Sequence, residues 1–170
     1  MENQRTALQT VEAFCRNWFE LRKTEKAAAF LAEDISFVGT GKKEVAQGKA
    51  EMTAYIRQDI RELQEPFACS FEMIHQQMLG KDICSISMEM ELKNTVYTWC
   101  LRVFFVLKQD EKQGWMIKNF HAAEPGRSQK GSEHYPQTVV VEAIAKQRQE
   151  MLNESYPGGM MGGYIADGFP

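Results

Sequence analysis

One charged side chain stands out because it interrupts an apolar segment. Arg102 lies within the run YTWCLRVFFVL, and an arginine in such a place must be ion-paired, exposed or bound to an anionic ligand. An ion pair with Glu89 or Glu91 on a neighbouring strand is one explanation. The other is a ligand carboxylate held by the fork of the guanidinium group. The sequence leaves both explanations open.

Two histidines occupy positions from which they could move a proton or orient a ligand. His75 and His121 each end an alternating segment, on the side that carries its bulky residues. They could equally be exposed histidines at strand ends. Two histidines are too few for a metal site without a carboxylate neighbour. We therefore expect no metal and no cofactor.

The cysteines do not form a metal-binding or redox motif. None of the four is paired as C-x-x-C, and the histidines do not lie at zinc-ligand spacing. Apolar residues flank each of them, which favours buried thiols in a reducing compartment. We expect all four to be buried: Cys15, Cys69, Cys84 and Cys100.

The composition is that of an ordinary globular protein. Of 170 residues, 44% are hydrophobic and 25% are charged, and the formal net charge is −3. Acidic and basic residues are interspersed without a basic stripe, so we expect no nucleic-acid partner. The first residues, MENQRTALQT, contain no apolar signal core, and no window has the length of a membrane span. We therefore expect a cytoplasmic segment without membrane contact.

The first part of the chain has helical periodicity. An amphipathic helix is predicted over residues 4–22 and a third helix over 49–64, ended by Pro66. Between them we expect a short helix through AAAFLAED, capped by Thr24, and a brief strand over 35–38. The apolar stripes that indicate the two longer helices are Leu8, Val11, Phe14, Trp18 and Leu21, and Met52, Tyr55, Ile56, Ile60 and Leu63.

The pattern then changes to alternation. Four segments, starting at residues 67, 84, 97 and 115, read as strands joined by short polar links, which predicts an antiparallel meander. Helices followed by strands indicate an α+β fold. A long sheet curled around helices leaves a concave pocket, suited to a small ligand or a partner's side chain.

The composition shifts after the last strand. Residues 125–136 read as a linker, and residues 137–153, QTVVVEAIAKQRQEMLN, as a connecting helix with a narrow apolar stripe. Such a stripe fits a helix that pairs with a second copy of itself.

Residues 5–124 resemble the nuclear transport factor 2-like superfamily, and within it the SnoaL-like branch. The resemblance is carried by the opening helix, by DISFVGTGKKEVAQGKAEM and by the closing GWMIKNFHAAEP. It implies a cystatin-like cone, in which a curved antiparallel sheet packs against N-terminal helices. The superfamily includes isomerases, dehydratases, polyketide cyclases and noncatalytic binding modules, and its members commonly form dimers through the outer face of the sheet.

The same resemblance suggests a site. A cone of this fold brings together Trp18 and Tyr55 from helices and Trp99 from the sheet, so we expect these residues to bind a ligand with Arg102 and His121. An isomerase would also place an acidic residue deep in the cone. Each candidate acid lies at a polar position of its segment, so we expect no catalytic residue. The candidate acids are Asp34, Glu72, Glu89 and Glu91.

The last residues resemble a different domain. LNESYPGGMMGGYIADGFP looks like a connecting helix that leads into the Gly-rich turn and first strand of a PAS domain, as in bacterial signalling proteins. We therefore expect residues 154–170 to be the truncated start of a PAS-like domain in a longer protein.

These observations lead to one functional hypothesis and two alternatives. We expect residues 1–124 to be a noncatalytic ligand-sensing or regulatory input domain of a bacterial signalling protein. It would bind a small molecule in the cone, dimerise through the sheet and act on downstream domains of the same chain. The alternatives are a SnoaL-like isomerase or cyclase acting on a small hydrophobic substrate, and a dimerisation module with a filled cone.

Overall fold

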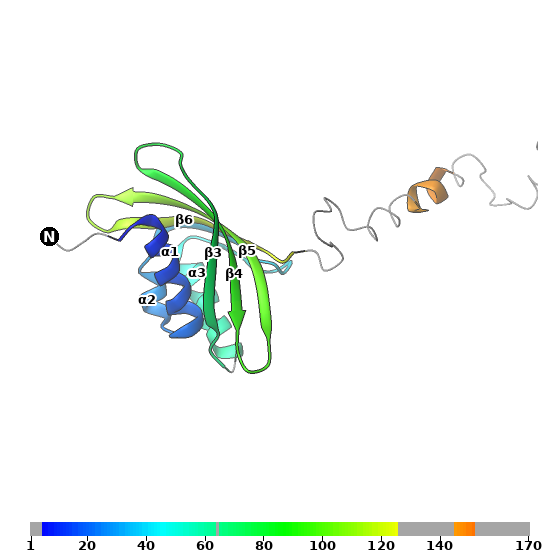
Figure 1. Cartoon of the computed structure of the whole chain (residues 1–170), viewed down its shortest axis with the longest axis horizontal. Coiled ribbons are helices and arrows are strands. Elements are labelled where there is room, and N and C mark those ends of the chain that lie inside the picture. The colour runs from blue at the N-terminus through cyan, green and yellow to red at the C-terminus, as the bar shows by residue number, and fades with distance from the viewer. Residues whose placement is uncertain (1–4, 64, 126–144, 152–170) are drawn as a thin grey trace, which may run out of the picture. The chain divides into compact units, whose positions relative to one another are not determined.

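A computed structural model describes residues 5–63, 65–125 and 145–151 (Figure 1). The chain divides into two compact units, residues 1–125 and 126–170. In the second unit residues 145–151 are helical and exposed, and they lie inside the helix expected over 137–153. Residues 126–136 of the expected linker and the expected PAS-like segment lie outside the described residues. No helix in the described ranges has the length and apolarity needed to span a bilayer.

The first predicted helix forms in two parts. Helix α1 (Ala7–Cys15) begins with a capping box, in which the Gln9 amide donates to Thr6 Oγ1 at 3.2 Å and Gln9 Oε1 accepts from the Thr6 amide at 2.9 Å. The chain then continues as one π-helical turn, η1 (Arg16–Glu20). Such widened turns are often found at functional sites, and this one carries the buried Trp18.

The expected second helix is only partly present. Helix α2 (Thr24–Ala28) ends early, and strand β1 (Leu31–Val38) takes up the residues that were predicted to continue the helix. The prediction was wrong because pairing with the last strand outweighs the helix propensity of this alanine-rich segment. Leu31 is fully buried and pairs with Ile117. Thr24 is the first helical residue rather than the cap.

Helix α3 (Lys49–Glu62) agrees with the predicted third helix. It follows strand β2 (Val45–Gln47), which the sequence did not indicate. Gly48 precedes α3 with a φ of +86°, a conformation that side chains other than glycine rarely adopt. Met52 and Ile56 are fully buried on the inner face of the helix.

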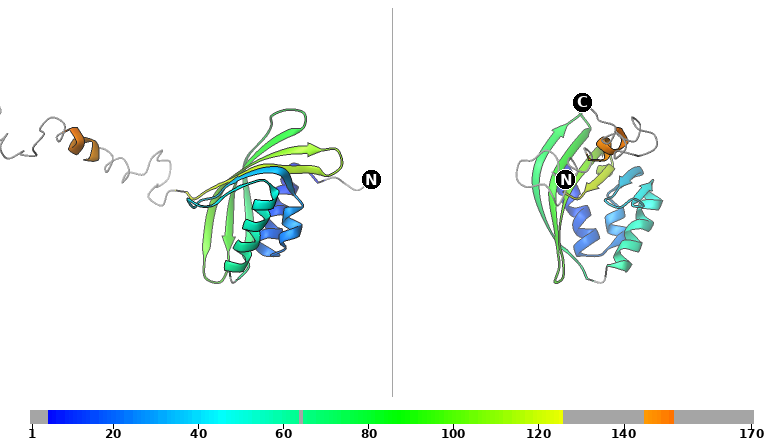
Figure 2. Two further views of the ribbon diagram at one scale, coloured as in Figure 1. Left: turned by 180° about the vertical axis from the view of Figure 1, so that it is seen from behind. Right: turned by 90° about the vertical axis from the view of Figure 1, so that its right-hand side faces the viewer.

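The predicted meander of four antiparallel strands is confirmed. These strands are β3 (Ala68–Met78), β4 (Ile83–Lys93), β5 (Thr98–Asp110) and β6 (Gly114–Ala123). The whole sheet has the order β2-β1-β6-β5-β4-β3 and is mixed, because β1 pairs in parallel with β6. The sheet curves around the three helices, which all lie on its concave side (Figure 2). The α+β fold class is therefore confirmed.

Aromatic side chains fill much of the space between helices and sheet. Phe105 and Phe120 stack with ring centroids 4.5 Å apart, and Phe14 from α1 meets both rings edge-on. All three are buried. Aromatic pairs of this kind contribute about 0.5–1.5 kcal/mol each beyond the area they bury. The deep part of the cone is thus a packed core.

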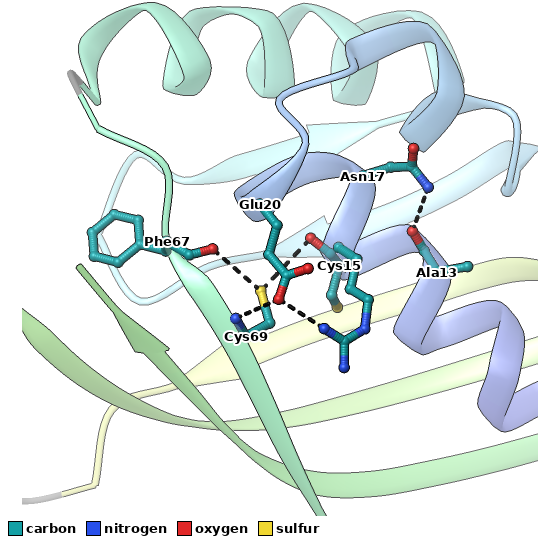
Figure 3. Close-up of polar contacts among 7 residues, drawn as sticks. Ala13, Cys15, Asn17, Glu20, Phe67 and Cys69 are labelled. Carbon is teal, nitrogen blue, oxygen red and sulfur yellow. Dashed lines mark hydrogen bonds and ion pairs between the residues drawn. The ribbon is translucent and has the colours of Figure 1, made fainter.

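Polar contacts fasten the edge strand β3 to the helices (Figure 3). Glu20 Oε1 accepts from the Cys69 amide and from Arg16, both at 2.7 Å. The neighbouring thiols are buried, and burial raises the pKa of both Cys15 and Cys69. Three cysteines are buried as expected, but Cys100 is exposed. That residue points to the outer face because its neighbour Leu101 points into the core.

Candidate functional site

A small cavity lies where η1, α3 and the turn between β1 and β2 meet the concave face of the sheet. Its volume is about 50 Å³, and its lining includes the exposed Thr40. Its lining residues are Trp18, Phe19, Phe37, Gly39, Thr40, Glu44, Tyr55, Asp59, Met90, Trp99, Leu101, Phe120 and Ala122.

Two larger hollows, of about 220 and 440 Å³, lie elsewhere on this unit. One is at the start of β1 and the β5–β6 hairpin, and the other is along α1. Both are lined mainly by charged and polar side chains, and Lys118 in the first is already paired with Asp34. Ligand sites usually combine apolar walls with a few convergent polar groups, and the small cavity has that character.

Aromatic rings form the wall of this cavity. The Trp18 indole stacks on Phe19 with centroids 4.5 Å apart and meets Tyr55 edge-on at 5.9 Å. The ring centroids of Phe37 and Tyr55 lie 5.0 Å apart. Trp99 adds a further ring from β5. The structure therefore brings Trp18, Tyr55 and Trp99 to one place, and their role in ligand binding stays a prediction.

A carboxylate faces this aromatic wall from α3. Trp18 Nε1 donates a hydrogen bond of 2.7 Å to Asp59 Oδ2. Burial raises the pKa of Asp59, the charges of Glu44 and Glu62 raise it further, and the bond from Trp18 opposes the rise. Asp59 therefore holds a proton more tightly than a solvated aspartate does.

Asp59 was not predicted as a site residue, although the sequence contains a signal for it. It follows Tyr55 by four residues and Met52 by seven, which places all three on one face of α3. An acid inside an otherwise apolar stripe is unusual, because carboxylates seldom face a core without a partner. Its partner, the Trp18 indole, is 41 residues away in the sequence, so the pairing could not be read locally.

A second carboxylate reaches the cavity from the turn between β1 and β2. Glu44 Oε2 accepts from the Gly41 amide at 3.0 Å and from Thr40 Oγ1 at 3.2 Å. This placement requires Gly39, since a Cβ there would lie 2.7 Å from the Glu44 Cβ. Burial raises the pKa of Tyr55, and the charge of Glu44 and its hydrogen bond with the phenol add to the rise.

The charges that line the cavity are of one sign. Among the described residues of the lining, Glu44 and Asp59 are acidic and none is basic. The positive charge of Arg22 lowers the pKa of Asp59, but it lies outside the lining and is the weakest of the influences named here. Arg22 donates a hydrogen bond to the carbonyl oxygen of Ile60. The cavity is thus electronegative and aromatic.

The other two residues expected at the site lie elsewhere. Arg102 and His121 are exposed on the outer face of the sheet, because Leu101 and Phe120 before them point inward. Arg102 Nε pairs with Glu89 Oε1 at 3.2 Å, which was the first of the two explanations for this arginine. The expected meeting of all five residues at one site therefore does not occur.

His75 is likewise exposed, on the edge strand β3. In the described ranges, no group of three or more His, Cys, Asp or Glu side chains is placed to hold a metal ion.

Comparison with solved structures identifies the fold. A protein from Thiobacillus denitrificans ATCC 25259, described as a candidate calcium/calmodulin-dependent protein kinase type II association domain, is 16% identical with a TM-score of 0.64, covering 74% of this chain and 100% of that one. An NTF2-like protein of unknown function from Shewanella oneidensis MR-1 is 14% identical with a TM-score of 0.59, covering 69% and 95%.

A domain of unknown function with a cystatin-like fold, from Nostoc punctiforme PCC 73102, is 14% identical with a TM-score of 0.59, covering 82% of this chain and 93% of that one. These likenesses define a protein of the NTF2-like, cystatin-like fold. Residues 8–125 match the SnoaL-like domain, and the chain belongs to that family. A search of curated proteins found no match.

Proposed function

We propose that the SnoaL-like unit binds a small molecule in the aromatic cavity and acts as a noncatalytic input domain. The observation that carries this proposal is the presence of Asp59 and Glu44 in the lining of a ring-walled cavity. Specific ligand sites combine such walls with a few oriented polar groups. The polar groups here are fixed by Trp18 and by the turn that contains Gly41.

A noncatalytic role is favoured by what the hydrogen-bond donors already do. Removing a carbon-bound proton needs a base and also a donor that stabilises the developing oxyanion. The indole of Trp18 is bound to Asp59, and the phenol of Tyr55 is bound to Glu44. The described lining contains no Lys, Arg or His that could replace them. The site therefore has a candidate base without a free electrophilic partner.

The wider assignment is also part of the proposal. We place this domain in the cytoplasm, in a bacterial signalling protein whose connecting helix reports ligand binding to a following PAS-like domain. The free thiols of the described cysteines support a reducing compartment. The sequence resemblance of the last residues supports the signalling context. A ligand changes the output only if it binds one conformational state better than another.

Homodimerisation through the outer face of the sheet completes the proposal. Phe104 and Val38 are 39% and 43% exposed there, on either side of His121 in the sheet register. Light scattering of the 170-residue chain should give twice the monomer mass, and Phe104→Glu should give the monomer. Monomeric wild type at high micromolar concentration would contradict dimerisation.

Ligand binding can be tested with the three tryptophans of the chain. Trp18 and Trp99 line the cavity and Trp115 does not. The indole N–H resonance of Trp115 is therefore an internal control for the other two. In a fragment screen of the full chain by ¹H–¹⁵N NMR, we expect cavity ligands to shift the first two and leave the third unchanged. A screen in which no fragment moves Trp18 or Trp99 would contradict ligand binding.

The second candidate function, an isomerase-type enzyme, is favoured by the raised pKa of Asp59 in an apolar site. It predicts that the chain catalyses exchange of the α-protons of a β,γ-unsaturated ketone in D₂O. Loss of that exchange in Asp59→Asn, with Glu62→Gln as a control on the same helix, would favour the enzyme over the sensor. Exchange at the buffer rate in wild type would favour the sensor.

A further inference from the structure

The inventory of charge around the cavity indicates what kind of ligand it takes. Glu44 and Asp59 enter the lining from two different elements, the β1–β2 turn and α3, and the described lining contains no cation. Elsewhere on the unit several carboxylates have basic partners, as in the pairs Arg102–Glu89 and Arg57–Glu25. Carboxylates that share a partly buried site normally pair with a positive charge.

These two carboxylates also act on each other. The charge of Glu44 raises the pKa of Asp59, so ionising both acids has an electrostatic cost. A ligand cation placed between them would remove that cost. Asp59 has capacity for it, because an ionised carboxylate offers about four acceptor sites and its side chain accepts one hydrogen bond, from Trp18.

The walls of the cavity suit the same charge. Trp18, Tyr55 and Trp99 line it, with Phe37 and Phe19. The faces of aromatic rings are negative and attract ammonium groups, best over Trp and Tyr, by about 0.5–2 kcal/mol depending on desolvation. An anionic ligand would meet two carboxylates and these rings, and would be repelled by both.

Size limits what can enter. A cavity of about 50 Å³ exceeds the ~30 Å³ that one water occupies in the liquid, but it cannot enclose a drug-sized molecule. A cavity of this size holds at most a head group, so the rest of the ligand must lie outside it.

We infer that the cavity binds the ammonium head of an organic amine, held between Asp59 and Glu44 and against the aromatic wall. This inference rests on the proposed function, because it names the ligand class of the same cavity. The amine donates to the free Asp59 oxygen while Trp18 keeps its bond to the other.

Binding should depend on pH through Asp59. The groups that act on it are Glu44 from the turn, Tyr55 and Glu62 from the same helix, Arg22 after η1 and the Trp18 indole. Protonation of Asp59 removes the charge that the ammonium group binds. Affinity should therefore fall as the pH is lowered through the pKa of Asp59, as long as the amine stays protonated.

The test uses three probes of matched shape and different charge: isobutylammonium, isobutanol and isobutyrate. Each is titrated into the full chain at neutral pH, and the Trp18, Trp99 and Trp115 indole resonances are followed. We expect isobutylammonium to shift the first two at a concentration about tenfold below that needed for isobutanol, a difference of about 1.4 kcal/mol. Isobutyrate should leave them unchanged.

Matched variants separate the cavity from general charge. Asp59→Asn and Glu62→Gln each remove one negative charge from α3, but only Asp59 lines the cavity. The amide that replaces the Asp59 carboxylate still offers an oxygen to Trp18. We expect the first variant to lower isobutylammonium affinity about tenfold and the second to change it less than about threefold. An unchanged Trp115 resonance shows that each variant is folded.

The outcomes distinguish the two proposals. Equal or tighter binding of isobutanol or isobutyrate at the cavity would overturn the cationic ligand and leave ligand binding intact. So would a cavity that binds other fragments but not isobutylammonium. If neither the probes nor any fragment of the screen moves Trp18 or Trp99, the proposed function fails as well.

Discussion

Strand β5 carries a phenylalanine on each face, one of them buried and the other exposed. Phe105 is fully buried and stacks on Phe120 at 4.5 Å, whereas its neighbour Phe104 is 39% exposed on the outer face. Charges follow the same division. On the outer face Arg102 has its carboxylate partner Glu89, whereas the two carboxylates that line the cavity on the inner side share no basic residue of that lining.

The contrast separates charges that have an oppositely charged partner from charges that do not. An exposed ion pair such as Arg102–Glu89 needs no ligand to explain it and contributes little to stability. The two acids of the cavity accept hydrogen bonds, but no basic residue of the lining neutralises them. The side of the sheet on which a charged residue lies is therefore more informative here than the presence of the charge itself.

The largest expected difference between the faces is in packing. Phe105→Ala should lower the free energy of unfolding by about 3–5 kcal/mol, because it leaves a cavity among Phe14 and Phe120. Phe104→Ala should cost less than about 1 kcal/mol if the chain is monomeric. Urea unfolding at low protein concentration measures both. Similar losses of unfolding free energy in the two variants would contradict the assignment of Phe105 to the core and Phe104 to the outer face.

The next effect concerns the glycine that makes room for a cavity acid. Gly39→Ala places a methyl group against the Glu44 side chain and Phe37, and should cost about 1–3 kcal/mol through forced displacement. Gly80→Ala is the matched control, since nothing lies within 4 Å of a Cβ there. Thermal unfolding compares them. Equal melting temperatures would mean that Glu44 is not held over Gly39.

A smaller effect is the pH dependence of the unfolding free energy, which should have opposite signs for Asp59 and Asp34. The raised pKa of Asp59 means that its contribution to stability is fully present below the unfolded value of about 3.8 and is lost as pH rises through its folded pKa. Relative to Asp59→Asn, wild type should therefore lose stability from about pH 4 upward. Unfolding free energies measured from acid to neutral pH check this.

Asp34 supplies the control with the reverse sign. Its hydrogen bond with Lys118 lowers the pKa of this exposed carboxyl. Its contribution is present above the unfolded value and is lost as pH falls through the folded pKa. Relative to Asp34→Asn, wild type should lose stability toward acid. Parallel pH profiles for the two variants would contradict the assigned environments.

The smallest expected effect is at the outer ion pair. Arg102→Gln should change the free energy of unfolding by less than about 1 kcal/mol, because both side chains of the pair are largely exposed. It should also leave amine binding in the cavity unchanged. A large loss of ligand affinity in this variant, measured by the Trp18 indole resonance, would indicate that Arg102 does contact the ligand.

The sequence predicted most of the fold but only part of the cavity. Helical and alternating periodicities are local, so α3 and the four-strand meander were read correctly. Strand β1 was predicted only in part, over residues 35–38, because its beginning pairs Leu31 with Ile117 of β6 across most of the domain. The ring cluster followed from the resemblance, which indicated which elements meet.

The acidic half of the cavity was not predicted, for a physical reason. Asp59 and Glu44 are ordinary charged residues in sequence, on a helix and in a turn. What distinguishes them is their common place in the lining of one cavity, which tertiary packing creates, and for Asp59 also the burial that raises its pKa. Arg102 and His121 were assigned to the ligand by residue type, but strand alternation places them on the other face.

The π turn η1 has a consequence for how this helix tolerates deletions. A π turn accommodates one residue more than an α-helical turn, so deleting Asn17 should let the segment close as a regular α-helix with the later side chains in nearly their present directions. Deleting a residue inside α1 should instead turn the side chains on one side of the deletion by about 100° relative to those on the other. The hydrogen bond from Trp18 to Asp59 should therefore survive the first deletion and be lost in the second.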